Sequence, residues 1–322
     1  MSFPLFRLPH LAIIVVFKNL SHEALFILSI STIKTKHSMI RTYLPRQYKT
    51  AHFHLCRLIK VITDNDPCHF RIFGLNTESW PKEAIRCSIG KELAAVHQTM
   101  GQMDFYWSHA DFNSAISSFI SQMVISWNCP KVSVTFDGFY DFTYFSILME
   151  EVKRNDLEIE SIYFLKNNFY VVKLETFFRE CKEIISKLSV DSEIDTFFKR
   201  RHSRNFIRVR ELEIKNCSWA YIEDFMECRS IKVECVNIEA RFGGYINNFI
   251  KKWMNDFECQ LEIVTITNCP FTFEQITHRL SGKGQARSVE VGENSLKLQR
   301  NDGKHILITL IERVLKIDLL FF

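Results

Sequence analysis

The sequence predicts an α/β protein in which three short helices near the amino-terminal end precede an irregular array of strands and helices. Apolar residues recur at helical spacing within the first forty residues, and β-favouring segments alternate with helical ones after residue 50. The chain has 322 residues, of which 47% are hydrophobic and 24% charged, so it can bury a substantial core as one or two domains. Gly and Pro number only 10 and 7, which leaves no room for a long flexible linker. We therefore expect the helices to dock on the segment that follows.

A proline and a regular apolar spacing predict the amino-terminal helices. Pro9 suits the first turn of a helix, because the N–H that it lacks would be unpaired there. Ser21 can cap a second helix, and residues 33–40 read as a third, shorter one. The apolar residues that form one face of the first two helices are Ile13, Val16, Phe17, Leu20, Leu25 and Leu28. Helices this short cannot enclose their own apolar faces, so we expect much of that surface to be buried against another protein or the rest of the chain.

This amino-terminal segment resembles an F-box, with Leu8-Pro9 in the place of the Leu-Pro that opens that motif. It is most similar to the nematode version, whose later positions are matched by Leu28, Ser29, Ser31, Lys36 and Ile40. The rest of the chain resembles the F-box-associated type 2 region of the same nematode family. That second similarity rests on residues 249–253, on Leu261-Glu262 and on the turn at residues 300–304.

The resemblance implies a domain boundary and a function. Residues 1–44 would form the F-box, and residues 45–322 the F-box-associated substrate-recognition region. The F-box would bind a Skp-family adaptor, and through it the cullin core of an SCF-type E3 ubiquitin ligase, while the second region would bind a protein target. Chemistry would reside in other subunits, so we expect no enzymatic activity in this chain. The residues implied in adaptor binding are Leu8, Pro9, Val16, Phe17, Leu20, Leu25 and Leu28. The alternative is a protein-interaction scaffold with a degenerate F-box that does not engage a ligase.

Short strands and amphipathic helices alternate in the rest of the chain. Strands are expected over residues 52–56, 70–75, 85–89, 132–136, 157–165, 209–214 and 231–236. Helices are expected over residues 111–124, 141–152, 177–188, 222–226 and 246–254. A closing hairpin is expected from residues 296–298 and 305–310, because Gly303 between them supplies the positive φ that a tight turn needs.

One internal repeat pairs Leu212-Glu-Ile-Lys-Asn-Cys217 with Val264-Thr-Ile-Thr-Asn-Cys269. The copies begin at residues 212 and 264, 52 positions apart, which is about two units at the period of leucine-rich repeats. We interpret this region as an irregular leucine-rich-repeat-like array, whose stacked strands leave one face open to a partner. The alternative is a non-repetitive α/β sheet.

The repeat also predicts which side chains face a target. Successive residues of a strand point to opposite faces of the sheet. The apolar residues expected to point inward are Leu212, Ile214, Val264 and Ile266. The outward residues expected to bind the target are Glu211, Glu213, Lys215, Glu262, Thr265 and Thr267.

Charge is unevenly distributed along the chain. Through residue 60 there are nine basic residues and one acidic one, a net charge of +8, whereas the remainder carries −4. The basic segment either steers the protein toward an acidic partner or is a solvated surface. Residues 199–204 (Lys-Arg-Arg-His-Ser-Arg) read either as a nuclear address or as a basic loop. We expect a cytoplasmic protein that also enters the nucleus if that address is used, with no nucleic-acid or membrane partner.

Other functional classes find little support. The apolar run at residues 11–17 is too short to span a membrane, and no Ala-x-Ala cleavage site of a secretory signal follows it. The ten cysteines contain no Cys-x-x-Cys, so we expect reduced thiols. Gly282-Lys-Gly284 lacks the rest of a phosphate loop, and His52 and His54 lack further ligands at metal-binding spacing. We therefore expect no cofactor and no metal. Trp107, Trp127, Trp219 and Trp253 are expected to pack in the core.

Overall fold

The protein is a mixed α/β chain that divides into two compact units, Met1–Glu160 and Ser161–Phe322. The structure is a computed structural model. It describes residues 8–20, 24, 27–28, 50–55, 59–63, 66–89, 91–99, 102–127, 131–137, 142–165, 184–191, 209–215, 222–234, 242–256, 259–278, 280, 287–300 and 302–320. The boundary predicted at residues 44 and 45 lies outside these described residues.

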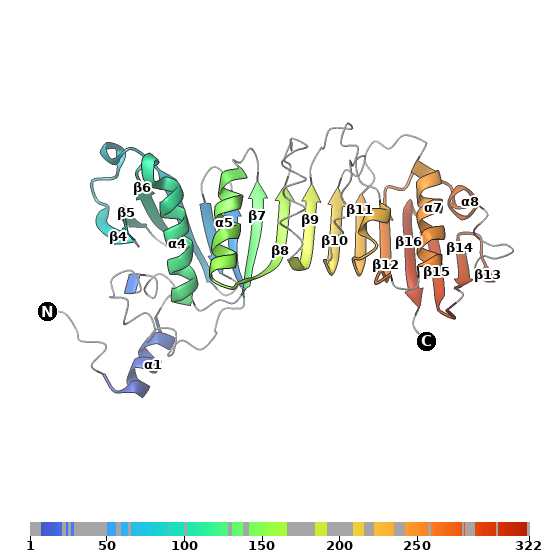
Figure 1. The fold of residues 1–322 in the computed structure, drawn as a ribbon, viewed down its shortest axis with the longest axis horizontal. Coiled ribbons are helices and arrows are strands. Elements are labelled where there is room, and N and C mark those ends of the chain that lie inside the picture. The colour runs from blue at the N-terminus through green and yellow to red at the C-terminus, as the bar shows by residue number, and fades with distance from the viewer. Residues whose placement is uncertain are drawn as a thin grey trace. The chain divides into compact units, whose positions relative to one another are not determined.

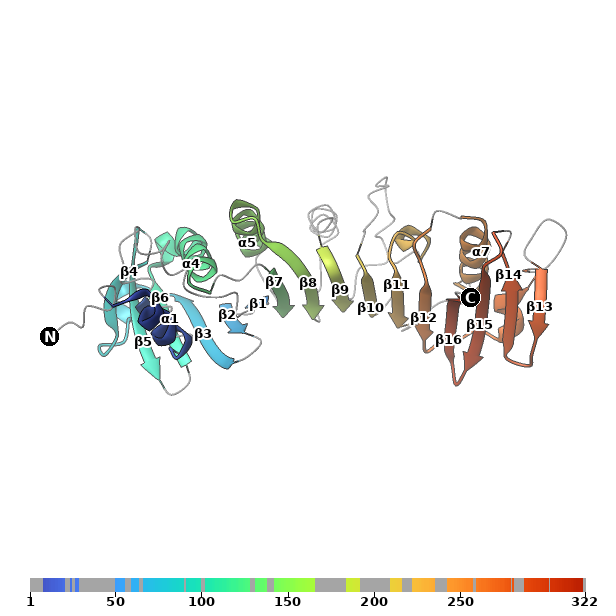
Figure 2. The same ribbon diagram turned by 90° about the horizontal axis from the view of Figure 1, so that it is seen from below.

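The first unit is built on a mixed sheet. Its strands are β1 (Thr50–Leu55), β2 (Ile59–Thr63), β3 (Asp66–Gly74), β4 (Ile85–Ile89), β5 (Glu92–Thr99), β6 (Gln102–Trp107) and β7 (Lys131–Asp137). Their order is β4-β5-β6-β3-β2-β1-β7, with β3–β6 and β1–β7 parallel and the other pairs antiparallel. The helices of this unit whose bounds lie in the described residues are α1 (His10–Lys18), η2 (Thr77–Ser79), η3 (His109–Asp111), α4 (Phe112–Trp127) and α5 (Phe142–Arg154). Figure 2 shows α4 and α5 on the same side of these strands.

Aromatic side chains fill the space between α4 and the strands beneath it. The ring centroid of Phe119 on α4 lies 5.0 Å from that of Phe105 and 5.8 Å from that of Trp107, both on β6. Phe70 on β3 completes the cluster, 6.0 Å from Phe105. All four side chains are fully buried. Aromatic rings at these separations contribute packing energy beyond their buried area, so this cluster fixes α4 on β3 and β6.

The second unit combines a parallel half with an antiparallel half. Its strands are β9 (Ile184–Asp191), β10 (Glu211–Lys215), β11 (Ser230–Glu234), β12 (Ile263–Thr267), β13 (Arg287–Val291), β14 (Ser295–Gln299), β15 (His305–Ile311) and β16 (Val314–Leu320). Strands β9 to β12 are neighbours in chain order and all parallel. β16 pairs antiparallel with β12 and is followed across the sheet by β15, β14 and β13. β8 (Glu158–Leu165) spans the boundary between the two units along the chain.

Helices lie on one face of the strands of the second unit (Figure 1), and the strand side chains on that face are apolar. The helices are η6 (Ile222–Phe225), α7 (Phe242–Asn255) and α8 (Phe273–Thr277). Every second residue of β10, β11 and β12 is buried, namely Leu212, Ile214, Ile231, Val233, Val264 and Ile266. The buried residues of α7 are Ile246, Asn247, Phe249, Ile250, Trp253 and Met254. The opposite face of β10 to β12 carries half-buried and exposed side chains.

The structure confirms most of the expected elements beyond residue 50. The predicted strand at 85–89 coincides with β4, and those at 132–136 and 157–165 match β7 and β8. The predicted helices at 111–124, 141–152 and 246–254 match α4, α5 and α7. The closing hairpin is formed by β14 and β15, and Gly303 in its turn has φ of 87°. Trp107 and Trp253 are fully buried, as expected, whereas the side chain of Trp127 and all of Trp219 lie outside the description.

Other expectations need correction. The helix predicted over 177–188 is wrong at its carboxyl end, because residues from Ile184 onward form β9. There, Leu188, Ser189 and Val190 are all buried, and Ser189 pairs in register with Glu213 of β10, so tertiary pairing overrides local preference. Pro9 is the N-cap of α1, one position before the first turn. β2, β5, β6, β13 and β16 were not anticipated.

The described residues include part of the second expected amino-terminal helix and none of the third. Ala24, Ile27 and Leu28 are helical, as expected for the second helix. Residues 33–40, the expected third helix, lie outside the described part of the chain.

Candidate functional site

The first candidate site is the exposed side of α1. The Pro9 carbonyl accepts the N–H of Ile13 at 3.1 Å, which starts the helix, and the Asn19 backbone N–H donates to the Val16 carbonyl at its end. Ile13 and Phe17 are 4% and 0% exposed, so one side of α1 is packed. Leu11 and Val15 on the other side are 75% and 59% exposed. A helix with apolar residues all around is normally buried, so this exposed side is unusual. We call Leu11 and Val15 the α1 outer face.

The residues implied in adaptor binding do not coincide with the α1 outer face. Phe17 is fully buried and serves packing. The residues that are half-buried are Leu8, Val16, Leu20 and Leu28, while Pro9 is exposed. Leu25 lies outside the described residues. Leu11 and Val15 were missed because the i, i+3, i+4 pattern was assigned to one face only. The signal that could have found them is the absence of polar residues on the opposite face.

The second candidate site is the open face of the parallel strands β9 to β12. Glu213 on β10 lies at its centre. The Lys187 ammonium is 3.0 Å from the Glu213 Oε2 atom, and the Lys232 ammonium is 3.1 Å from its Oε1 atom. Burial disfavours the charged form of Glu213, but the hydrogen bonds from the two lysines outweigh it and lower the pKa of this carboxyl. The hydrogen bond to Glu213 in turn raises the pKa of Lys187.

The predicted target-binding residues on β10 and β12 do face away from the helices. Glu211 is exposed, and Glu213, Lys215, Thr265 and Thr267 are half-buried. Lys215 is ion-paired with Asp191 of β9 at 3.5 Å. The apolar residues expected to point inward, Leu212, Ile214, Val264 and Ile266, are all buried.

Glu262 is placed differently from the expectation. It lies before β12, and the N–H groups of Glu262 and Ile263 both donate to the Arg229 carbonyl, at 2.8 and 3.3 Å. This shared acceptor shifts the alternation of inward and outward side chains along the strand by one residue. Ile263, 38% exposed, therefore takes the outward place, while the Glu262 carboxylate pairs with the Arg229 guanidinium at 2.6 Å.

Hydrogen bonds join the separate sequence segments on which the second resemblance rests. The Trp253 indole N–H donates to the Leu261 carbonyl at 3.1 Å. The buried Arg300 guanidinium donates to the Asp256 carbonyl at the end of α7, at 3.0 Å, and pairs with Asp302 at 3.3 Å. A cation at a helix carboxyl end is favoured by the helix dipole. These contacts fix the end of α7 against the loops around it.

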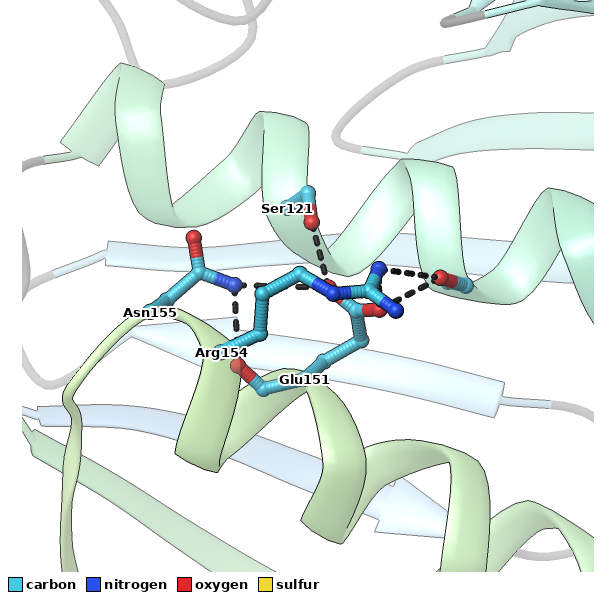
Figure 3. Close-up of polar contacts among 5 residues, drawn as sticks. Ser121, Glu151, Arg154 and Asn155 are labelled. Carbon is cyan, nitrogen blue, oxygen red and sulfur yellow. Dashed lines mark hydrogen bonds and ion pairs between the residues drawn. The ribbon is translucent and has the colours of Figure 1, made fainter.

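A buried carboxylate between α4 and α5 is structural (Figure 3). Glu151 is 1% exposed and accepts the hydroxyls of Ser117 and Ser121, each at 2.5 Å. Arg154 also donates to this carboxylate, and Asn155 donates to its Oε2 atom at 3.3 Å. A carboxylate offers about four acceptor positions. Four donors occupy them, so no position is left for a substrate, and the cluster holds α5 on α4.

A second buried carboxylate is also fully engaged. Asp104 on β6 accepts both arms of the Arg71 guanidinium, at 2.7 and 2.6 Å, and the hydroxyl of Tyr106 at 3.3 Å. Such a bidentate pair joins β3 to β6. Burial and the Asp104 charge raise the pKa of Tyr106, so its phenol stays protonated at neutral pH and remains a hydrogen-bond donor to Asp104.

The described residues contain no group of three or more His, Cys, Asp or Glu side chains that could hold a metal ion. His52 and His54 lie on β1 and are half-buried. Cys87, Cys228, Cys259 and Cys269 are reduced cysteines that form no disulfide. Within the described parts of the chain, no helix is long and apolar enough to cross a membrane.

Comparison of the chain with protein-family models, with curated proteins and with solved structures finds no match. The class that the fold and the two surfaces define is therefore a mixed α/β protein with an exposed apolar helix face and an open, ion-paired strand face.

Proposed function

We propose that this chain is the substrate-recognition subunit of an SCF-type ubiquitin ligase. In this proposal α1 belongs to an F-box that binds a Skp-family adaptor, and the second unit contributes the surface that binds a protein target. The chain supplies proximity between target and ligase rather than catalysis. The observation that carries the proposal is the α1 outer face, because Leu11 and Val15 leave apolar surface exposed on a helix that is otherwise packed.

The parallel strands of the second unit, which we interpret as a leucine-rich-repeat-like array, support the target-binding half of the proposal. Leu212, Ile231 and Val264 occupy the same register on β10, β11 and β12. Each of β10, β11 and β12 is parallel to the strand before it. The two connecting helices that the structure describes, η6 and α7, lie on one face (Figure 2), as in stacked repeats. At the end of β12, Asn268 adopts φ of 55° and Cys269 is buried, so the second Asn-Cys copy marks the turn out of the strand.

Adaptor capture tests the proposal directly. Leu11→Lys with Val15→Lys places two charges on the α1 outer face without touching the buried Ile13 and Phe17. Burying a Leu or Val side chain at an interface contributes ~1.5 kcal/mol or more each, so we expect adaptor affinity to fall about 100-fold. Ile85→Lys is the matched control, because Ile85 in the same unit is 74% exposed and lies on β4.

Two results would contradict the adaptor half. One is a wild-type chain that captures no Skp-family adaptor, which would favour the scaffold with a degenerate F-box. The other is a Leu11/Val15 variant that is folded by circular dichroism and still captures as much adaptor as the Ile85 control. Mass spectrometry of the captured proteins reports the target in the same experiment.

A further inference from the structure

β4 is the end strand of the sheet in the first unit (Figure 1). It pairs with β5 on one side, and its other side has no neighbour among the described strands. Three of its five side chains, those of Ile85, Arg86 and Ser88, are exposed, so the edge reaches solvent. An open edge presents a row of backbone N–H and C=O groups that can pair with another strand.

β4 lacks the features that commonly protect such an edge. Its register with β5 is continuous over all five residues, without a bulge, and its sequence Ile-Arg-Cys-Ser-Ile contains no proline or lysine. In the second unit, by contrast, the end strand β13 has a register shift between Ser288 and Glu290. Of these two end strands, β4 is the one whose backbone is regular enough to continue the sheet.

Apolar surface is exposed at one end of β4. The side chains of Ile85, Cys87 and Ile89 share one side of the sheet, because alternate residues of a strand point the same way. That side is the one on which α4 lies, since Cys87 pairs with Ala94, and Ala94 pairs with Trp107 beneath α4. Exposure rises along the strand: Ile89 is fully buried, Cys87 is half-buried, and Ile85 is 74% exposed. A strand that pairs along β4 would cover Ile85 and bury apolar area.

The sequence of β4 is complementary to itself in one antiparallel register. A two-fold axis through Cys87, normal to the sheet, sets Ile85 opposite the partner's Ile89 and Arg86 opposite the partner's Ser88. All five residues then pair, apolar side chains meet on the α4 side, and no like charges are directly opposite. An axis through Arg86 would instead set two guanidinium groups directly opposite each other, which is destabilising. The self-complementary register therefore favours a second copy as the occupant of this edge.

We propose that a second copy of this chain binds along β4, so that the sheets of two first units join through antiparallel β4 strands. Backbone hydrogen bonds between the two strands, and burial of Ile85 against the partner's Ile89, stabilise this dimer. Five residues from each copy form a small interface, so the dimer is weak and its population depends on protein concentration. The inference goes beyond the proposed function and does not depend on an adaptor or a target.

Sedimentation equilibrium of the full chain tests the dimer. Ile85 enters the interface twice, so we expect Ile85→Lys to raise the dissociation constant about 100-fold. Ile311→Lys is the matched control, because Ile311 is 64% exposed on a strand of the second unit, and it should leave the dissociation constant nearly unchanged. Circular dichroism should show both variants folded, since both side chains are exposed. A wild-type chain that stays monomeric across the micromolar range would overturn the proposal, and so would equal weakening by the two variants.

Cys87 reports the register of the dimer. In the proposed pairing the two Cys87 Cβ atoms lie about 4.5–5.5 Å apart, so a short bis-maleimide can join the two sulfurs. A Cys87–Cys87 link forms only between two copies, so mass spectrometry identifies it even in a chain with ten cysteines. Labelling of Cys87 by a monomaleimide controls for access to the thiol. We expect the link in wild type and in Ile311→Lys, and its loss in Ile85→Lys at the same concentration. A dimer in which Cys87 takes the monomaleimide but forms no link would overturn the proposal, because its contact would lie elsewhere.

Discussion

Glu151 allows a quantitative test of how α5 is held on α4. In Glu151→Leu, the hydroxyls of Ser117 and Ser121 lose their acceptor while remaining half-buried. A hydrogen bond to a charged group contributes about 1.5 kcal/mol, so the two bonds give ~3 kcal/mol. The Arg154 contact is left out of this sum because that side chain is 64% exposed.

Because the chain has two compact units, the loss of stability should be measured at individual amides, by native-state hydrogen exchange. A loss of ~3 kcal/mol should accelerate exchange of the α4 and α5 amides by about 100-fold while α7 amides stay unchanged. The triple variant Ser117→Ala, Ser121→Ala, Glu151→Leu removes donors and acceptor together, so it should recover most of the protection. Unchanged exchange rates in the single variant would refute this account of the cluster. Exchange in the triple variant that is as fast as in the single variant would refute it as well.

The remaining predictions concern α1, Glu213 and the cysteines. Phe17→Ala should destabilise the packing of α1 by ~3 kcal/mol or more, because the ring is fully buried, whereas Leu11→Ala should change its stability by no more than ~0.5 kcal/mol. Limited proteolysis near residue 20 compares the two variants, and equal resistance to the protease would contradict this difference in stability. The pKa of Glu213 is lowered in the folded state, so its contribution to stability is present above pH 4.5 and is lost as pH falls through the folded pKa; urea unfolding of wild type and Glu213→Gln should therefore converge toward acid, and a constant difference would argue against the lysine pairing. Burial raises the pKa of Cys228 to about 12, so this thiol should alkylate more slowly than Cys87 in the native protein, and all ten cysteines should react in non-reducing urea; protected pairs in mass spectrometry would show disulfides instead.

Residues whose environment is set locally could be predicted from the sequence. The alternation of Leu212 and Ile214 with charged neighbours is enough to place one face of β10 inward. The spacing of Phe249 and Trp253 likewise identifies the buried side of α7.

Elements that depend on distant partners could not be predicted in this way. β5 contains Ala94 and Ala95, which favour helix, and pairing with β4 and β6 on its two sides makes this segment a strand. Asp104 is a charged residue in a buried strand, and its partner Arg71 comes 33 residues earlier. The ion pairs of Glu213 depend on the register of three strands, which no single segment encodes.

The antiparallel pairing of β16 with β12 has a consequence for biosynthesis. From Thr267 to Leu320 the ribosome adds about fifty residues, which takes roughly 3–10 s at ~5–20 residues per second. During that interval the backbone edge of β12 has no neighbour on one side, although its other side already pairs with β11. An uncovered edge is a template for pairing with other chains. Nascent or carboxyl-terminally truncated forms that lack β16 should therefore be the species that chaperones hold, because β16 is the strand that covers this edge of β12.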